Sequence, residues 1–439
     1  MGQQGKHLNS IKVSHEKHTA GCATEIMAIP ETVCISMSQH IGAPCKPLVK
    51  KGDQVKVGQL IGDTDAFVSA PIHSSVSGTV KEISTIRSVT GGDDQVVIIE
   101  TDGNQDVYEE IKPPVINDMK DFIAAVRASG LVGLGGASFP THIKLNPKNL
   151  EEVDTLIVNA AECEPFITSD HRLMLENTED IIKGAVAIMK HLGLKKGHIG
   201  VEENKPDAIE KLRKVIADMG HSGDIEVNVL RARYPQGAER VMIYEITGKT
   251  LRAGMLPADV GVILSNVTTI AFIGQYLETG RPLTTKRVTV DGNAVAEPKN
   301  IIVPIGARIA DVIAACGGYK AEPKKILMGG PMMGRAVYSD AFPIIKNNNA
   351  ILAFDGPQAL IPEETGCIKC GRCHGACPFK LLPVSIAEAY ENKDAERLQA
   401  LEVMQCMECG SCSYVCPARR PLSFINKMAK GMLKEAANK

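Results

Sequence analysis

The sequence predicts a multidomain α/β protein in which strand-rich and helix-rich units follow one another along the chain. Three observations support this fold class. Short strands bounded by turns occupy residues 30 to 85, helices and strands alternate over residues 117 to 280, and two cysteine-rich runs lie on either side of residue 400. A chain of 439 residues is long enough for two to four domains.

Composition and charge exclude several classes of function. The chain is 44% hydrophobic and 23% charged, as soluble globular proteins are, and its net charge is −2. It has no Trp and only 4% aromatic residues, so we expect no nucleic-acid partner. No apolar run reaches the roughly 18 residues of a transmembrane span. Residues 1 to 21 also lack the apolar segment of a signal peptide.

The strand-rich region contains two related halves. LVKKGDQVKVGQLIG and FVSAPIHSSVSGTVKEI resemble the two halves of a lipoyl/biotinyl hammerhead. The hairpin between them, DTDA, has no lysine to which a cofactor could be attached. We therefore predict a structural lipoyl/biotinyl-like β-sandwich over residues 25 to 110, and not a swinging arm that carries a cofactor.

Helices and strands alternate after this region. DMKDFIAAVRAS has the pattern of an amphipathic helix, DTLIVNAA is typical of a buried strand, and TEDIIKGAVAIMKHLG predicts a helix that ends at Gly193. Strands separated by helices imply βαβ units and a parallel sheet. We predict an α/β domain over residues 111 to 283.

The pattern changes again after residue 283. KRVTVDGNAV is typical of a hairpin, and IIVPIGARIADVIAACGG predicts a strand followed by a helix. These elements predict a small β-grasp (SLBB-like) module over residues 284 to 345. Residues 345 to 365 are expected to link this module to the last unit of the chain.

Eight of the thirteen cysteines fall in two runs, and each run ends on a proline. Both runs have the spacing C-x2-C-x2-C-x3-C-P, which is the bacterial ferredoxin pattern for 4Fe-4S clusters. The other five cysteines are scattered without disulfide spacing, which favours a reducing compartment. The metal-ligand candidates are Cys367, Cys370, Cys373, Cys377, Cys406, Cys409, Cys412 and Cys416.

The spacing also predicts which cysteines share a cluster, because in two-cluster ferredoxins the last cysteine of each run binds the other cluster. We therefore place Cys416 with the first three cysteines of the first run, and Cys377 with the first three of the second run. Two zinc sites are the alternative, but zinc sites commonly use separated CxxC pairs. Residues 382 to 404 between the runs have helical periodicity, so we predict an α-helical ferredoxin domain over residues 360 to 430.

A glycine-rich stretch, GLVGLGGASFPTHIK, spans residues 130 to 144. It follows a predicted helix and has Ser138 where G-x-G-x-x-G needs a glycine, so a Rossmann fingerprint is not expected. Gly133, Gly135 and Gly136 would still let backbone N–H groups approach a phosphate or a flat ring closely. Lys144 would then meet the phosphate or the reduced ring. The alternative is a tight turn without a ligand.

Polar residues follow the predicted strands of the α/β domain. LIVNAAECEP places Asn159, Glu162 and Glu164 at a strand end, where ligands of α/β sheets bind. Two later stretches add further candidates, which are Gly237, Glu239 and Asn266. The alternative for these acids is a solvated loop.

Taken together, these stretches resemble the FMN- and NADH-binding subunit of respiratory complex I. GLGGASFPT matches the G-x-G-G-A-G-F-P-T loop of that family, and NAAECEP matches its N-A-x-E-x-E-P motif. The order of units over residues 25 to 425 is more similar still to the C subunit of the Rnf complex, an ion-translocating ferredoxin:NAD oxidoreductase. The chain departs from the complex I pattern at Ser138, Ala161 and Leu256.

The resemblance implies cofactors and roles. It implies two 4Fe-4S clusters, FMN and NAD(H), with Glu164 and Glu239 seating the nicotinamide nucleotide at the catalytic centre. The residues expected around the cofactors are Gly133, Gly135, Gly136, Lys144, Asn159, Glu162, Gly237 and Asn266.

The resemblance also implies partners, which are the other Rnf subunits and, through them, ferredoxin. The chain would lie at the cytoplasmic face of the cell membrane in a complex that moves Na+ or H+. Two alternatives remain. One is a soluble protein that feeds electrons to a cytoplasmic reductase, and the other is a cluster-bearing subunit whose flavin pocket is inactive.

Overall fold

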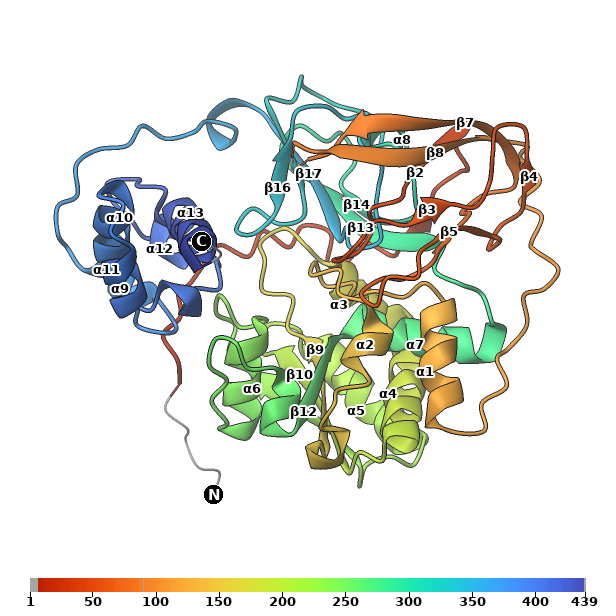
Figure 1. Ribbon diagram of the computed structural model, residues 1–439, viewed down its shortest axis with the longest axis horizontal. Helices are drawn as coiled ribbons and strands as arrows, with labels where there is room; N and C mark the ends of the chain where they lie inside the picture. The colour runs from red at the N-terminus through yellow and green to blue at the C-terminus, as the bar shows by residue number, and fades with distance from the viewer. Residues whose placement is uncertain (1–6, 90, 438–439) are drawn as a thin grey trace.

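The computed structural model describes residues 7–89 and 91–437 and arranges them in four units (Figure 1). Two small sheets form the first unit, a parallel sheet with helices forms the second, and a six-stranded sheet forms the third. A helical unit completes the chain and lies to one side of the other three (Figure 1). This mixed α/β architecture confirms the predicted fold class.

The first unit is a β-sandwich of two sheets with strand orders β2-β8-β7-β4 and β3-β5-β6. Its strands alternate buried and exposed side chains, because one face of each sheet packs on a core that includes Val33, Ile35 and Ile99. The strands are β2 (Thr32–Ser36), β3 (Lys46–Pro47), β4 (Gln54–Val55), β5 (Leu60–Asp63), β6 (Ile72–His73), β7 (Gly78–Arg87) and β8 (Asp93–Thr101).

The second unit contains a four-stranded sheet in which every strand is parallel to its neighbours, in the order β11-β10-β9-β12. The predicted helix after the first strand ends at Gly193, whose φ of 69° is the left-handed conformation that glycine adopts readily. The strands are β9 (Thr155–Ala160), β10 (Lys196–Glu202), β11 (Ile225–Leu230) and β12 (Val262–Asn266). The helices are α1 (Met119–Ala128), α2 (Thr141–Lys144), η1 (Leu150–Glu152), α3 (Ser169–Glu176), α4 (Thr178–Leu192), α5 (Pro206–Asp218), α6 (Glu239–Thr247), η2 (Pro257–Val260) and α7 (Val267–Thr279).

The third unit is a mixed sheet with the order β1-β14-β13-β17-β15-β16 and one short helix, α8 (Ile309–Ala314). Its strand β17 (Ala350–Phe354) lies in the segment that we expected to be a linker. All five residues of β17 are buried between β13 and β15, because the run AILAF is apolar throughout. The other strands are β1 (Glu25–Ile26), β13 (Thr285–Asp291), β14 (Lys299–Pro304), β15 (Lys325–Met328) and β16 (Arg335–Val337).

The fourth unit is helical, as predicted, but the segment between the cysteine runs forms two helices and not one. Lys393 has a φ of 54°, which interrupts the helical backbone, and the Asp394 side chain then accepts a hydrogen bond from Arg397 N and caps the next helix. The helices are η3 (Gly356–Gln358), α9 (Arg372–Ala376), α10 (Pro383–Glu391), α11 (Ala395–Ala400), η4 (Val403–Gln405), α12 (Ser411–Tyr414) and α13 (Leu422–Ala437).

Residues 7 to 20 form an extended segment, the N-terminal segment, that runs between the helical unit and the other units (Figure 1). Asn9 Nδ2 donates to the carbonyl of Cys377 in the helical unit at 3.1 Å. Lys17 Nζ donates to three backbone carbonyls of residues 162 to 167 in the α/β unit. Among the residues that the structure describes, no helix is long and apolar enough to span a membrane.

Candidate cofactor sites

The carboxyl ends of the parallel strands bring together most of the residues that the sequence singled out for a flavin. Asn159 ends β9 next to Asn266, which ends the adjacent strand β12. Asn159 Nδ2 donates to the carbonyl of Gly237 at 2.8 Å. A Cβ added to Gly135 would lie 2.9 Å from the Cβ of Asn266, so the glycine loop packs directly on this strand end. The edge of the sheet therefore forms a single site.

The glycine loop presents backbone donors at this edge. The N–H groups of Gly135, Gly136 and Ala137 have no acceptor among the described residues. Gly136 has a φ of 111°, and a Cβ placed on it would meet nothing within 4 Å, so the loop faces open space there. Ser138 adopts a φ of 53° and is buried, which lets it replace the glycine of the family pattern. A turn with free N–H groups is a binding surface for phosphate or ring oxygens.

Lys144 and Glu239 lie opposite each other at the open side of this loop. Lys144 Nζ contacts Glu239 Oε2 at 2.7 Å, and both side chains are about one third exposed. Glu239 is the first residue of α6, where a carboxylate is favoured by the helix dipole. The pair gives the site one cation and one anion that a ligand can reach.

Glu162 and Glu164 lie inside the protein and not in a solvated loop. Both oxygens of Glu162 accept backbone N–H groups at the start of α3, at 2.6 and 3.1 Å. Glu164 Oε2 accepts from Met332 N at 3.0 Å, and its other oxygen is buried without a partner among the described residues. Burial raises the pKa of Glu164 to about 7, although the N–H of Met332 opposes this shift. In this arrangement the Glu164 carboxylate faces the loop at residues 329 to 334 and not Lys144.

Four cysteines line one cavity in the helical unit. They are Cys377, Cys406, Cys409 and Cys412, the set predicted to share a cluster. Burial, together with the thiolates of the other three, raises the pKa of Cys412 to about 12. The thiols surround the cavity and do not meet at a point. Among the described residues, no group of three His, Cys, Asp or Glu is arranged to hold a single metal ion. We call this set the inner cysteines.

The remaining four cysteines form the outer set, which comprises Cys367, Cys370, Cys373 and Cys416. Cys370 is exposed, whereas Cys409 and Cys412 of the inner set are buried. Burial raises the pKa of Cys373, and the thiolate of Cys416 adds to the shift, so a cysteine of each run lies close to the other run. The two sets therefore have the crosswise arrangement that the spacing predicted.

The two runs also repeat one backbone geometry at a separation of 39 residues. Lys369 N donates to the sulfur of Cys367 at 3.4 Å, and Glu408 N donates to the sulfur of Cys406 at the same distance. Lys369 and Glu408 both have positive φ, of 56° and 60°. N–H groups that point at the sulfur stabilise a thiolate ligand and tune the potential of a bound cluster.

Two residues that the sequence analysis missed connect the flavin-side edge to the inner cysteines. Tyr234 Oη donates to the carbonyl of Cys409 at 2.6 Å. Arg240 donates to the Gln405 carbonyl at 2.9 Å and to its side-chain oxygen at 2.6 Å, and its guanidinium lies 3.9 Å from the ring centre of Phe379. Both residues flank Gly237 and Glu239 in the sequence, so one short loop contacts both sites.

Four family models match successive parts of the chain. The RnfC barrel sandwich hybrid domain matches residues 6–104, and the Nuo51 FMN-binding domain matches residues 126–275. The SLBB domain matches residues 287–336, and the 4Fe-4S dicluster domain matches residues 359–417.

Relatives that match over most of their length bear one common name. The C subunit of the proton-translocating ferredoxin:NAD(+) oxidoreductase complex of Clostridium ljungdahlii is 44% identical, over 84% of this chain and 80% of its own. The C subunit of the Na(+)-translocating complex of Acetobacterium woodii is also 44% identical, over 91% of this chain and 90% of its own. The chain belongs to the RnfC family. The C subunit of the ion-translocating oxidoreductase complex of Rhodobacter capsulatus, 36% identical over 96% of this chain and 82% of its own, is a more distant relative.

The sites of this RnfC-family protein fit the cofactors of its matched domains. Free loop N–H groups, Lys144 and the two asparagines suit the phosphate and ring of FMN. Two sets of four cysteines, one of them around a shared cavity, suit two 4Fe-4S clusters. A solved NAD+-reducing NiFe hydrogenase in the H2-reduced state is 18% identical, with a TM-score of 0.49 over 73% of this chain and 61% of its own.

Proposed function

We propose that this protein is the peripheral NAD(H)-reacting subunit of a membrane-bound Rnf complex, where it passes electrons between ferredoxin-derived 4Fe-4S clusters and NAD. The junction between the flavin-side edge and the inner cysteines carries this proposal. Tyr234 bonds to the backbone of Cys409, two residues before Gln236 and three before Gly237. A flavin at the glycine loop and a cluster at the inner cysteines would therefore be neighbours.

The residues at the flavin-side edge have separable tasks. The loop N–H groups and Asn266 hold the phosphate and orient the ring, and Asn159 fixes the position of Gly237. Lys144 supplies positive charge next to the ring, and Glu239 accepts from the ribose or amide of the nicotinamide nucleotide. When bound, FMN exchanges two electrons with NAD(H) and single electrons with iron–sulfur clusters.

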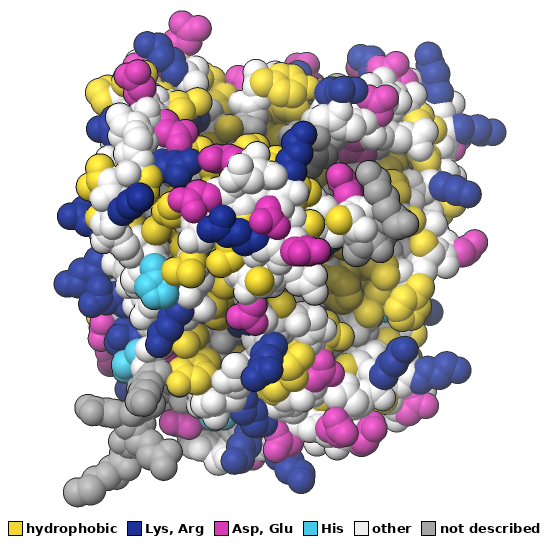
Figure 2. All heavy atoms as spheres, turned by 60° about the vertical axis from the view of Figure 1, so that its left-hand side comes forward, with side chains coloured by type: hydrophobic (Ala, Val, Ile, Leu, Met, Phe, Trp, Pro, Cys, Tyr) yellow, Lys and Arg dark blue, Asp and Glu magenta, His cyan; other side chains and the backbone are white. Residues whose placement is uncertain are grey.

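The exposure of the cysteines suggests the order of the clusters. The inner set lies next to the flavin-side edge, and the outer set reaches the surface at Cys370. Apolar side chains are exposed on the same unit, among them Ile361, Ile368 and Phe424. Figure 2 turns this side of the molecule forward and shows apolar patches among scattered charges. We assign this surface to the iron–sulfur and membrane subunits of the complex, with the protein at the cytoplasmic face of the membrane.

The test uses the full chain purified without oxygen. Iron and released FMN are quantified per chain, and NADH is then added while flavin absorbance and cluster electron paramagnetic resonance are recorded. We expect about eight iron atoms and one FMN per chain, rapid bleaching of the flavin, and reduced clusters afterwards. Iron without FMN would favour the inactive-pocket alternative and reject the catalytic proposal.

A glycine variant separates flavin binding from cluster binding. In Gly135→Val the new side chain would collide with Asn266, so we expect FMN to be lost while iron stays near the wild-type content. Gly223→Val is the matched control, because a Cβ at Gly223 meets nothing within 4 Å and its backbone is not strained. Retention of FMN in Gly135→Val would contradict the assignment of the loop.

Membrane association distinguishes the proposal from a soluble reductase partner. A subunit of the complex should co-purify with the membrane fraction and leave it in high salt or detergent. Recovery of the protein from the soluble fraction together with a cytoplasmic reductase would support the alternative.

A further inference from the structure

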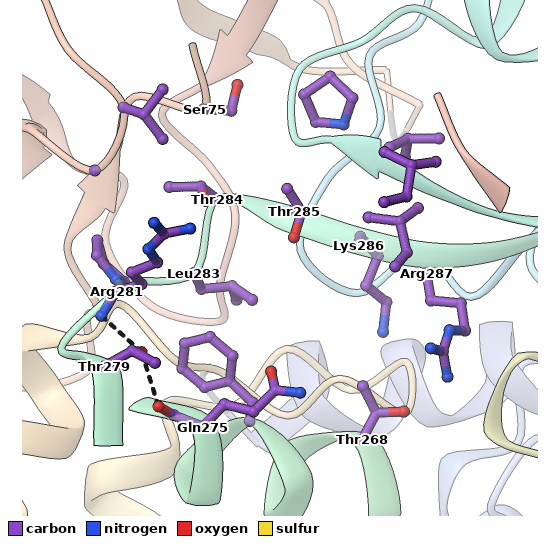
Figure 3. Close-up of a pocket in the computed structure, with 18 of the residues that line it drawn as sticks. Ser75, Thr268, Gln275, Thr279, Arg281, Leu283, Thr284, Thr285, Lys286 and Arg287 are labelled. Carbon is purple, nitrogen blue, oxygen red and sulfur yellow. Dashed lines mark hydrogen bonds between the residues drawn. The ribbon is translucent and has the colours of Figure 1, made fainter. Parts of the chain in front are cut away.

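A cavity of about 440 Å³ lies where three units meet, apart from the flavin-side edge and the cysteines (Figure 3). The β-sandwich contributes Val57 and Ser75, helix α7 contributes Phe272 and Gln275, and strands β13 and β14 form another wall. This volume is within the usual range for sites that bind small molecules. None of the steps in the proposed electron transfer uses the cavity.

Two cationic side chains of β13 enter this cavity. Figure 3 shows Lys286 and Arg287 extending toward Thr268 and Gln275 of α7. Lys286 is only 4% exposed, and its ammonium group donates to the Leu134 carbonyl at 3.2 Å. Two of its three N–H groups have no acceptor within the described ranges.

Arg287 is also incompletely paired. Its Nη2 donates to Asn177 Oδ1 at 2.8 Å and lies 3.1 Å from Glu176. Its Nε and Nη1 are buried without a partner in the part of the chain that the structure describes. Glu176 is shared with Arg172, which contacts it at 2.6 Å, so it does not neutralise Arg287 alone.

The surroundings leave this end of the cavity positive. Burial lowers the pKa of Lys286 to about 8, and the charge of Asp170 opposes this shift, so Lys286 is mostly protonated at neutral pH. Asp170 is itself hydrogen-bonded to Asn266 and Thr268. Buried cations with unused donors are costly unless an anion completes them. Arg281 adds a further cation at the rim.

The rest of the cavity is mainly apolar. Leu283, Ile302 and Val303 form its wall beside Phe272 and Ala271 of α7. We propose that this cavity binds a small organic carboxylate, whose head group meets Lys286 and Arg287 and whose apolar body packs along α7 and β14. A carboxylate suits the site because it carries the single negative charge that the local excess requires.

The test is calorimetric titration of octanoate into the full chain with its cofactors bound, and octanamide serves as an uncharged probe of the same length. We expect octanoate to bind with a sub-millimolar Kd and octanamide to bind at least about tenfold more weakly. Lys286→Met should weaken octanoate binding by a similar factor, because it keeps the length of the side chain and removes the charge. Lys324→Met is the matched control, since Lys324 is exposed and lies outside the cavity.

A second variant fills the space without removing charge. Ala271→Phe places a ring where the apolar body would lie and should abolish octanoate binding, with iron, FMN and melting temperature used to confirm folding. Absence of octanoate binding to the wild type would overturn the proposal. Equal binding of octanamide, or binding that survives Ala271→Phe, would also overturn it.

Discussion

Burial distinguishes the individual cysteines of the two sets. Cys409 and Cys412 are 9% and 8% exposed, whereas Cys370 lies at the surface. Solvent and small oxidants therefore reach the outer set first. At the scale of single residues, this difference makes Cys370 the most informative ligand to replace, since its loss disturbs the core least.

We expect Cys370→Ser to remove one cluster and leave the flavin in place. A serine oxygen is a poor replacement for a thiolate ligand, so iron should fall from about eight to about four atoms per chain. Iron and FMN analysis checks this result, with Cys22→Ser as control because Cys22 lies outside both runs. Loss of FMN with both clusters retained would show that the two sites have been assigned to the wrong units.

Glu164 should make the stability of the protein depend on pH. Its folded pKa, raised to about 7 by burial, lies above its ordinary value near 4.3. The folded chain therefore keeps a proton that the unfolded chain loses, so stability falls as pH rises from about 4 to 7 and levels off above that range.

We expect Glu164→Gln to reduce the loss of stability between pH 5 and pH 8 by roughly 2 kcal/mol, because an amide does not ionise. Thermal unfolding at the two pH values measures this difference. Glu226→Gln is the control, since that side chain is 71% exposed. An equal pH dependence in Glu164→Gln and the wild type would contradict the buried carboxyl.

The loop that leads into α6 is the element on which the proposed electron path depends. Tyr234 and Arg240 contact the helical unit, while Gly237 and Glu239 between them belong to the flavin-side edge. Because these contacts are made within seven residues, a shift of the loop would change the distance between both sites at once.

We expect Tyr234→Phe to keep iron and FMN but to slow the reduction of the clusters after NADH is added. The variant leaves the Cys409 carbonyl without its donor, which should cost about 1 kcal/mol of stability and loosen the junction. Stopped-flow absorbance and thermal unfolding measure the two effects. Tyr338→Phe is the control, as Tyr338 is 73% exposed; indistinguishable behaviour of the two variants would exclude a role for the junction.

At the scale of the whole molecule, the N-terminal segment holds the units together. Asn9 bonds to the helical unit, Ile11 pairs with Tyr234 of the α/β unit, and His18 contacts Asp291 of the six-stranded sheet at 3.1 Å. Its strongest contact is that of Lys17, whose ammonium group satisfies three buried carbonyls.

We expect Lys17→Met to lower the stability by about 2 kcal/mol or more, because hydrogen bonds to a charged donor are lost and their acceptors stay buried. The melting temperature should fall, with Lys12→Met as control because Lys12 is exposed in the same segment. Equal melting temperatures of the two variants would show that the segment does not secure the fold.

Local patterns were predictable from the sequence, and long-range contacts were not. The cysteine spacing and the glycine loop act over a few residues, so their geometry follows from their own motifs. Tyr234 meets Cys409 from 175 residues away, and no pattern around a single tyrosine indicates such a partner. Glu164 was interpreted as an acid near the ligand, and its burial under Met332 depends on a loop 168 residues further along the chain. Its role with the nucleotide stays a prediction.

Short buried strands were also missed because a brief apolar run has no distinctive period. The run AILAF of β17 is only five residues long and was assigned to a linker. The division into domains at residues 25 to 110, 111 to 283, 284 to 345 and 360 to 430 likewise stays a prediction.

The contact between Asn9 and Cys377 joins residues that leave the ribosome 368 positions apart. At a synthesis rate of about 5 to 20 residues per second, the nascent chain waits about 20 to 70 s between these two events. During that time Ile11 and Val13, both buried in the finished protein, have no surface of the helical unit to cover them. The beginning of the segment is thus translated early and secured late, and chaperones have that interval in which to bind it.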